Sequence, residues 1–194
     1  MKKNYLKPTI KRMTKFGLIT ITACSGVFMA TGTIIAQAKL TNQSKVIVNG
    51  IGDVRVGMTV TEASQVADTR ITSLSGTAIN NKGCFYVKPE GEPKGVAFML
   101  IDGRIARVDV SKNSSVTTKK RAKIGDSEYQ IKSLYPGQIK VEPHKYVSGG
   151  HYLIFVPKDK VDSKYRLVFE TDGKKVTEFR SGKLPEVEYV ERCS

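Results

Sequence analysis

The chain has 194 residues, of which 32 are Lys or Arg and 18 are Asp or Glu, so its formal net charge is +14. No long low-complexity tract interrupts it, which is typical of a folded domain rather than a disordered chain. The signatures G-x-S-x-G and H-E-x-x-H and the Walker phosphate loop are all absent, which leaves several enzyme classes without support.

Residues 1–38 have the three parts of a secretory signal peptide. Six basic residues precede Phe16, and the segment contains no acidic residue. A mostly apolar, uncharged stretch then runs over 16–35, and positions 36–38 read Ala-Gln-Ala, the A-x-A pattern of a cleavage site. We therefore expect cleavage after Ala38 and a mature protein that is periplasmic or secreted.

The same segment leaves two alternatives open. Residues 21–24 resemble the lipobox of bacterial lipoproteins, in which the cysteine, here Cys24, is acylated, although the apolar run continues well past it. A retained membrane anchor is the other alternative, since about 20 apolar residues can span a bilayer; three glycines weaken that span. Only these alternatives, a lipoprotein or an anchored protein, attach the chain to a membrane.

Cleavage after Ala38 would remove six basic residues and leave 26 basic and 18 acidic ones, a net charge of +8. Such a surface favours anionic partners: lipid headgroups, acidic polysaccharide or an acidic face of a protein. Nucleic acid is not expected as a partner outside the cell. The simpler alternative is that the charge keeps a small exported domain soluble.

Two cysteines, Cys84 and Cys193, lie after the signal segment. An even pair in a small exported domain predicts a disulfide, which here would tie the end of the chain to its first half. A redox or metal-ligating role has less support, because neither cysteine lies in a C-x-x-C motif.

Two segments, 54–66 and 122–134, align without gaps at an offset of 68 residues. In both, an apolar residue and a glycine precede a hydroxyl residue that is followed three places later by Glu or Gln. The pairs are Thr59 with Glu62 and Ser127 with Gln130. This pattern is a capping box, so both segments predict a short helix that begins at the hydroxyl residue.

Segments rich in β-formers follow each predicted helix. The expected strands cover 84–87, 96–101 and 104–110 in the first half, and 138–141, 152–156, 165–169 and 176–179 in the second. An Asp-Gly pair, at 102–103 and again at 172–173, predicts a tight hairpin before the last strand of each half.

This repeated order predicts an α+β fold of two tandem units, each a short helix packed on an antiparallel β-meander. The expected boundaries are 39–110 for the first unit, 111–121 for a polar linker, and 122–194 for the second unit with a C-terminal tail. The linker ends in Lys119-Lys120-Arg121, which is either an anion-binding cluster or part of a solvated connection.

The duplicated helix start followed by a meander resembles the tandem-repeat fold of the beta-lactamase inhibitory protein and the related single-copy SmpA/OmlA lipoproteins. The element order covers most of 51–180, and the motif itself covers about 13 residues per copy. The resemblance implies a shared sheet that binds a protein partner. This chain departs from it in its single possible disulfide and in the lack of a matching inhibitory loop.

The candidate contact surface is the segment 138–156, with Tyr146, His151 and Tyr152 around the Ser-Gly-Gly turn at 148–150. Aromatic residues dominate protein interfaces because they bury a large area at low entropic cost. The only two histidines, His144 and His151, define the alternative, an acid–base or metal site with Glu142, but their spacing fits no standard zinc pattern.

We therefore expect an exported, non-catalytic binding module that contacts a protein or an anionic envelope component, with an inhibitor-like role as one form of it. No metal or cofactor is expected. The alternative is a small periplasmic hydrolase or metal-binding protein that uses His144 and His151.

The signal analysis predicts that the exported protein begins at Lys39. The intact mass and the N-terminal sequence of the envelope form check this. A product that begins at an acylated Cys24 would contradict it and would attach the protein to a membrane.

Overall fold

The computed structural model describes residues 39–74 and 83–193. The predicted signal peptide, and with it Cys24, lies outside these residues. Within the described part, none of the helices has both the length and the apolar character needed to cross a bilayer.

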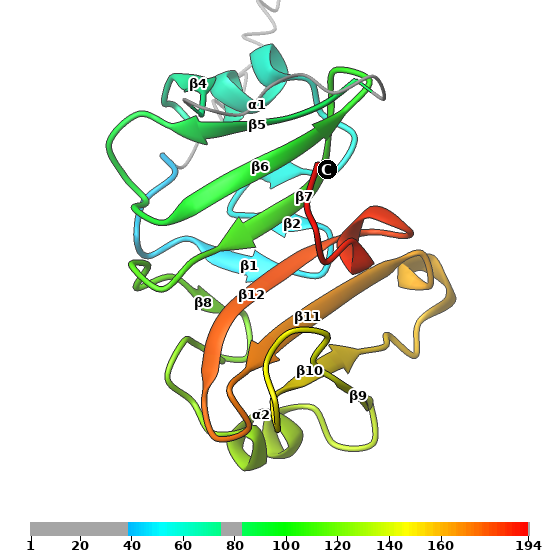
Figure 1. Cartoon of the computed structure of the whole chain (residues 1–194). Coiled ribbons are helices and arrows are strands. Elements are labelled where there is room, and N and C mark those ends of the chain that lie inside the picture. The colour runs from blue at the N-terminus through cyan, green and yellow to red at the C-terminus, as the bar shows by residue number, and fades with distance from the viewer. Residues whose placement is uncertain (1–38, 75–82, 194) are drawn as a thin grey trace, which may run out of the picture. The chain divides into compact units, whose positions relative to one another are not determined.

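Eight strands form one large antiparallel sheet (Figure 1). Four come from the first half of the chain: β4 (Ile71–Ser73), β5 (Cys84–Pro89), β6 (Val96–Ile101) and β7 (Arg104–Val110). Four come from the second: β9 (Ile139–Pro143), β10 (His151–Phe155), β11 (Tyr165–Thr171) and β12 (Val176–Lys183). The order is β4-β5-β6-β7-β12-β11-β10-β9, so the two halves meet at β7 and β12.

A small sheet of very short strands has the order β3-β2-β1-β8. These strands are β1 (Lys45–Ile47), β2 (Gly50–Ile51), β3 (Val54–Arg55) and β8 (Thr117–Thr118). β8 pairs in parallel with β1, and it lies inside the segment that the sequence predicts as a linker. The end of that segment is therefore fixed to the N-terminal strands.

The prediction of an α+β fold made of two helix-on-meander units is wrong. The described chain is mostly β, and its two α-helices, α1 (Val60–Val66) and α2 (Glu128–Leu134), have only seven residues each. Two 3-10 turns, η1 (Lys160–Asp162) and η2 (Glu186–Glu188), add little helix. The physical reason is that each capping box begins a helix of only about two turns, whereas the strands of the large sheet and the additional small sheet make up most of the regular structure.

The predicted helix starts are confirmed. The hydroxyls of Thr59 and Ser127 accept from the backbone N–H groups of Glu62 and Gln130, both at 3.2 Å. The side chains of Glu62 and Gln130 accept in return from the two cap residues' backbone N–H groups. The bond from the Thr59 N–H is the main reason that the pKa of Glu62 lies below its ordinary value.

The repeat also fixes how each helix start joins its meander. The N–H of Gly57 donates to the carbonyl of Ile105 at 2.7 Å, and the N–H of Gly125 donates to the carbonyl of Val176 at 2.9 Å. The two glycines have φ angles of 95° and 88°, a left-handed region that other residues rarely adopt. This requirement explains why glycine precedes both capping boxes.

The main core lies between the two sheets and under both helices. The small sheet and the helices each add apolar side chains to one face of the large sheet. Its buried members include Val46, Ile51, Val54, Ala63, Phe98, Leu100, Ile105, Ile131, Leu153, Phe169 and Phe179.

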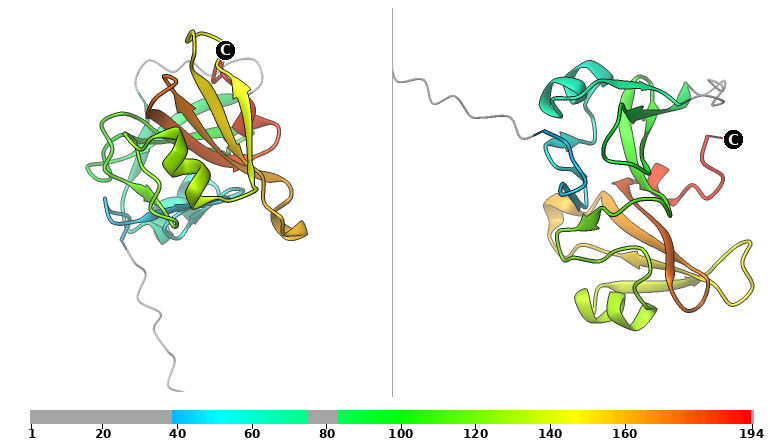
Figure 2. Two further views of the ribbon diagram at one scale, coloured as in Figure 1. Left: turned by 90° about the horizontal axis from the view of Figure 1, so that it is seen from below. Right: turned by 90° about the vertical axis from the view of Figure 1, so that its left-hand side faces the viewer.

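The other face of the large sheet is crossed by the C-terminal segment 184–193, which we call the C-terminal strap. Figure 2 (right) shows the C-terminal end on the opposite side of the sheet from α1. η2 contacts β7, β11 and β12, and Val187 is fully buried. The predicted disulfide between Cys84 and Cys193 is present and joins the strap to β5, with the two Cα atoms 5.5 Å apart.

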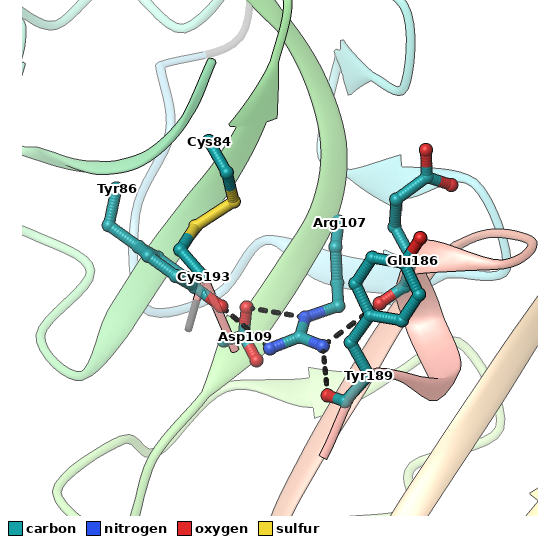
Figure 3. The surroundings of a disulfide bond; sticks show 7 residues. All are labelled: Cys84, Tyr86, Arg107, Asp109, Glu186, Tyr189 and Cys193. Atoms are coloured by element: carbon teal, nitrogen blue, oxygen red, sulfur yellow. Dashed lines mark hydrogen bonds and ion pairs between the residues drawn. A yellow bond between two sulfur atoms is a disulfide. The ribbon is translucent and has the colours of Figure 1, made fainter. Parts of the chain in front are cut away.

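Two buried arginines hold the strap, and Figure 3 shows the first of them, Arg107. The guanidinium of Arg107 donates to the carbonyls of Glu186 and Tyr189 at 3.0 and 2.7 Å, and also to Asp109 and Tyr86. Burial by itself would lower the pKa of Arg107, but Asp109 and then Tyr86 outweigh it and raise that pKa above its ordinary value.

Arg180 repeats this arrangement one strand away. Its Nε donates to the carbonyl of Val187 at 2.6 Å, and its Nη1 pairs with the carboxylate of Glu170. The strap is therefore held by an apolar contact, by buried charged hydrogen bonds and by a covalent bond.

Replacement of Ser127 with Ala should lower the free energy of unfolding by about 1 kcal/mol, because the first turn of α2 loses its cap. Urea unfolding of the oxidised protein measures this. Ser148→Ala is the matched control, since Ser148 is exposed in the β9–β10 loop, and it should change stability by less than about 0.5 kcal/mol. Equal effects of the two changes would contradict the importance of the cap.

Candidate functional site

The predicted contact residues lie in and beside the loop 144–150, which joins β9 to β10. His151 and Tyr152 are consecutive residues at the start of β10 and therefore point to opposite faces of the sheet. Tyr146 lies in the loop and is 62% exposed, whereas Tyr152 is only 7% exposed. The structure does not bring these three side chains together on one surface.

His151 points toward α2. Its Nδ1 lies 2.7 Å from Oε1 of Glu128, and the hydroxyl of Thr171 donates to the same oxygen at 2.6 Å. Burial would raise the pKa of the Glu128 carboxyl, but the bonds from Thr171 and His151 outweigh it and hold that pKa below its ordinary value. The hydrogen bonds from His151 and Thr171 to Glu128 join the start of α2 to the large sheet.

Tyr152 points toward the C-terminal strap and packs with Ile154, Val168 and Val187. Its ring stacks on His144 with 4.5 Å between centroids. His144 in turn lies 3.3 Å from Glu170, which also pairs with the buried Arg180. The ring of Tyr152 is therefore part of the buried layer beneath the strap, and it is not available for contact with a partner.

Tyr146 does lie on the surface, beside the end of the strap. Its hydroxyl bonds to the carboxylate of Glu191, which also pairs with Lys145 at 2.7 Å. That pairing raises the pKa of the Lys145 ammonium above its ordinary value. Val147 and Tyr189 are 40% and 42% exposed, so the loop and the strap both present apolar surface.

The two histidines do not form the alternative site. His144 faces Glu170 on the strap side, and His151 faces Glu128 on the helix side. Among residues 39–74 and 83–193, there is no cluster of three or more His, Cys, Asp or Glu side chains suited to hold a metal ion.

A second candidate site is a pocket of about 480 Å³ that we call the basic pocket. It lies where the small sheet meets the end of α2 and strands β10 and β11. Its walls are formed by Val46, Ile47, Val48, Asn49, Arg55, Lys119, Lys120, Leu134, Tyr135, Gln138, Phe155, Asp162 and Leu167. The volume is within the range of roughly 300–1,000 Å³ that is typical of small-molecule sites.

Carbon-rich side chains make up one part of this pocket. Tyr135 and Leu167 belong to the core and are 5% and 4% exposed, and Leu134 and Phe155 pack partly buried against it. The rings of Tyr135 and Phe155 have centroids 4.8 Å apart. The pocket thus reaches down to the aromatic layer beneath α2.

Charged side chains make up another part. Arg55, Lys119 and Lys120 contribute three positive charges and Asp162 one negative charge, so the ionised lining has a net charge of +2. Both lysines are exposed, and neither has an ion-pair partner among the described residues. The Lys119-Lys120-Arg121 run was the one signal in the sequence that pointed here, and it did not indicate the apolar part.

A short turn holds the two lysines at the pocket. The N–H of Arg121 donates to the carbonyl of Thr118 at 2.8 Å, which closes the turn around Lys119 and Lys120. The N–H of Lys119 donates to the carbonyl of Val46 at 2.9 Å, which attaches the turn to β1. The β8–β1 pairing therefore places the backbone of both lysines beside the pocket.

Comparisons with known proteins do not assign this chain to a family. No protein-family model matches the sequence, and the search for similar curated proteins found no match. The chain is similar in structure to the uncharacterized protein yfeY from Escherichia coli, with a TM-score of 0.42 and 16% identity. That alignment covers 75% of this chain and 100% of the other.

The different surroundings of the two tyrosines predict different effects on stability. Tyr152→Ala should lower the free energy of unfolding by about 3–5 kcal/mol, as for other buried aromatic residues. Tyr146→Ala should change it by about 0.5 kcal/mol or less. Urea unfolding of both variants measures this, and a Tyr152→Ala protein as stable as the wild type would contradict the assignment of Tyr152 to the buried layer.

Proposed function

We propose that the chain is an exported, non-catalytic binding module that acts on an anionic component of the cell envelope, with the basic pocket as its binding site. The observation that carries this proposal is the pair Lys119 and Lys120, whose backbone lies in a tight turn and whose side chains line a pocket of about 480 Å³. Two neighbouring positive charges without ion-pair partners among the described residues favour the binding of an anion beside the apolar part of the pocket.

The charge of the mature chain supports the same proposal. A protein that begins at Lys39 has a net charge of +8, which favours encounters with negatively charged surfaces. The hydrolase or metal-binding alternative has less support, because His144 and His151 lie on opposite faces and each is engaged with its own glutamate.

A protein partner is the second candidate. It is favoured by the exposed Tyr146, Val147 and Tyr189. Loss of one stoichiometric envelope partner in Tyr146→Ala, but not in Tyr129→Ala, would point to this surface. Tyr129 is the matched control because it is 79% exposed on α2.

The double variant Lys119→Glu/Lys120→Glu should bind octyl sulfate about tenfold or more weakly than the wild type at low ionic strength. Exposed ion pairs contribute roughly 0.2–1 kcal/mol each, and reversal of both charges replaces attraction with repulsion. Isothermal titration calorimetry measures the dissociation constant, and the loss should shrink as salt is added.

The matched control is Lys174→Glu/Lys175→Glu, which makes the same charge change at an exposed pair of lysines in the β11–β12 turn. This control should keep most of the affinity. If both double variants bind octyl sulfate equally well, the pocket is not the anion site and the proposal fails.

A further inference from the structure

We infer that the ligand of the basic pocket is a single-chain anionic amphiphile, whose alkyl chain lies on the aromatic floor and whose head lies at Lys119 and Lys120. This inference rests on the proposed function and deepens it, since it names the class of anion. It follows from which polar atoms of the pocket are already engaged and which are not.

Two polar groups of the lining beside the aromatic rings are engaged within the protein. The hydroxyl of Tyr135 donates to Oγ1 of Thr118 at 2.9 Å, so Tyr135 offers only its ring. The side-chain amide of Gln138 donates to the carbonyl of Val156 at 3.3 Å. Beside these engaged groups, Leu134, Tyr135 and Phe155 present carbon surface, which suits an alkyl chain better than a sugar or a peptide backbone.

Arg55 is also partly engaged. Its Nη1 donates to the carbonyls of Gly52 and Val54, at 2.5 and 3.1 Å. These bonds hold the guanidinium against the small sheet, where its charge contributes to the field of the pocket. The ammonium groups of Lys119 and Lys120 have no such internal bonds among the described residues, so they are the groups suited to bind the head of a ligand.

Asp162 fixes the orientation that we assign. It is the one carboxylate of the lining, and it comes from η1, whereas the lysines come from the β8 turn. An anionic head is repelled from Asp162 and attracted to the lysines. The apolar residues Leu134, Tyr135 and Phe155 then remain for the chain.

The test is a series of n-alkyl sulfates from butyl to decyl, titrated as monomers into the wild-type protein and into Lys119→Glu/Lys120→Glu. Each methylene that enters the pocket should tighten binding by about fourfold. Octyl glucoside, which has a chain of the same length but no charge, should bind at least tenfold more weakly than octyl sulfate.

A second measurement locates the chain. Val48→Trp should fill the pocket from its wall and remove the dependence on chain length, whereas Val161→Trp should leave it unchanged. Val161 is the matched control, because it is 78% exposed on η1 and does not line the pocket. Thermal unfolding shows whether each variant is folded. If neither variant folds, the dependence of wild-type binding on alkyl-chain length still tests the inference.

The outcomes separate the inference from the proposed function. Binding that depends on the two lysines but not on chain length overturns the inference and leaves the proposed function standing. Binding that is unaffected by Lys119→Glu/Lys120→Glu overturns both. Bilayer vesicles of phosphatidylglycerol that bind as tightly as the monomers, through the same lysines, would also overturn the inference, because a headgroup surface would then suffice.

Two sources of such a ligand share this chemistry, a free fatty acid and a single-chain phospholipid. Decanoate and decanoyl lysophosphatidylglycerol carry the same acyl chain on different heads. Tighter binding of one of them identifies the source, and equal binding shows that the pocket recognises only the chain and a negative charge. Either result supports the inference, and failure of both ligands to compete with decyl sulfate would overturn it.

Discussion

The pairing of β7 with β12 is the constraint on which the rest of the structure depends. Four residue pairs, from Val110 with Phe179 to Arg107 with Gly182, join the two meanders. A Cβ atom on Gly182 would lie 2.5 Å from the carbonyl oxygen of Ala106, so only glycine permits this close approach. The result is one wide sheet with two faces, and every candidate site belongs to one face or the other.

The two faces are covered in different ways, and this decides what each can do. The small sheet and the helices cover one face, and the junction of unlike elements leaves the basic pocket. The strap covers the other, and there Arg107 and Arg180 are only 1% and 5% exposed. Buried guanidinium groups without partners would be strongly destabilising. The strap carbonyls therefore contribute to the stability of the fold. Removal of the strap would leave the guanidinium groups of Arg107 and Arg180 without the hydrogen bonds that they donate to it.

Much of the local structure could be predicted from the sequence. The capping boxes, the Asp-Gly hairpin at 102–103 and the disulfide each depend on residues that are close in sequence or on a simple count, and the structure contains all of them. The second Asp-Gly pair lies in a longer turn, residues 172–175, between β11 and β12. The fold class was wrong because a capping box shows where a helix begins but not that it ends after seven residues. The small sheet was missed because strands of two or three residues have too few positions to show an alternation.

The candidate site was less predictable for related reasons. His151 and Tyr152 are adjacent in sequence, yet strand geometry places them on opposite faces. Tyr146, by contrast, was expected at the surface and is there. The basic pocket takes its lining from segments as far apart as Val46 and Leu167. The sequence marks only the pair Lys119 and Lys120, by its charge, and a run of charges is equally typical of a solvated linker.

The strap also connects the fold to the compartment that residues 1–38 imply. Cys84 and Cys193 are 109 residues apart, and closure of so long a loop stabilises by roughly 4–5 kcal/mol in the chain-entropy model. Small domains have a total stability of about 5–15 kcal/mol, so this bond is a large share of it. In a reducing compartment, the strap would depend on the packing around Val187, on hydrogen bonds to Arg107 and Arg180, and on exposed ion pairs such as that of Glu191 with Lys145. Disulfides persist in oxidising compartments, and the predicted signal peptide would direct the chain to one.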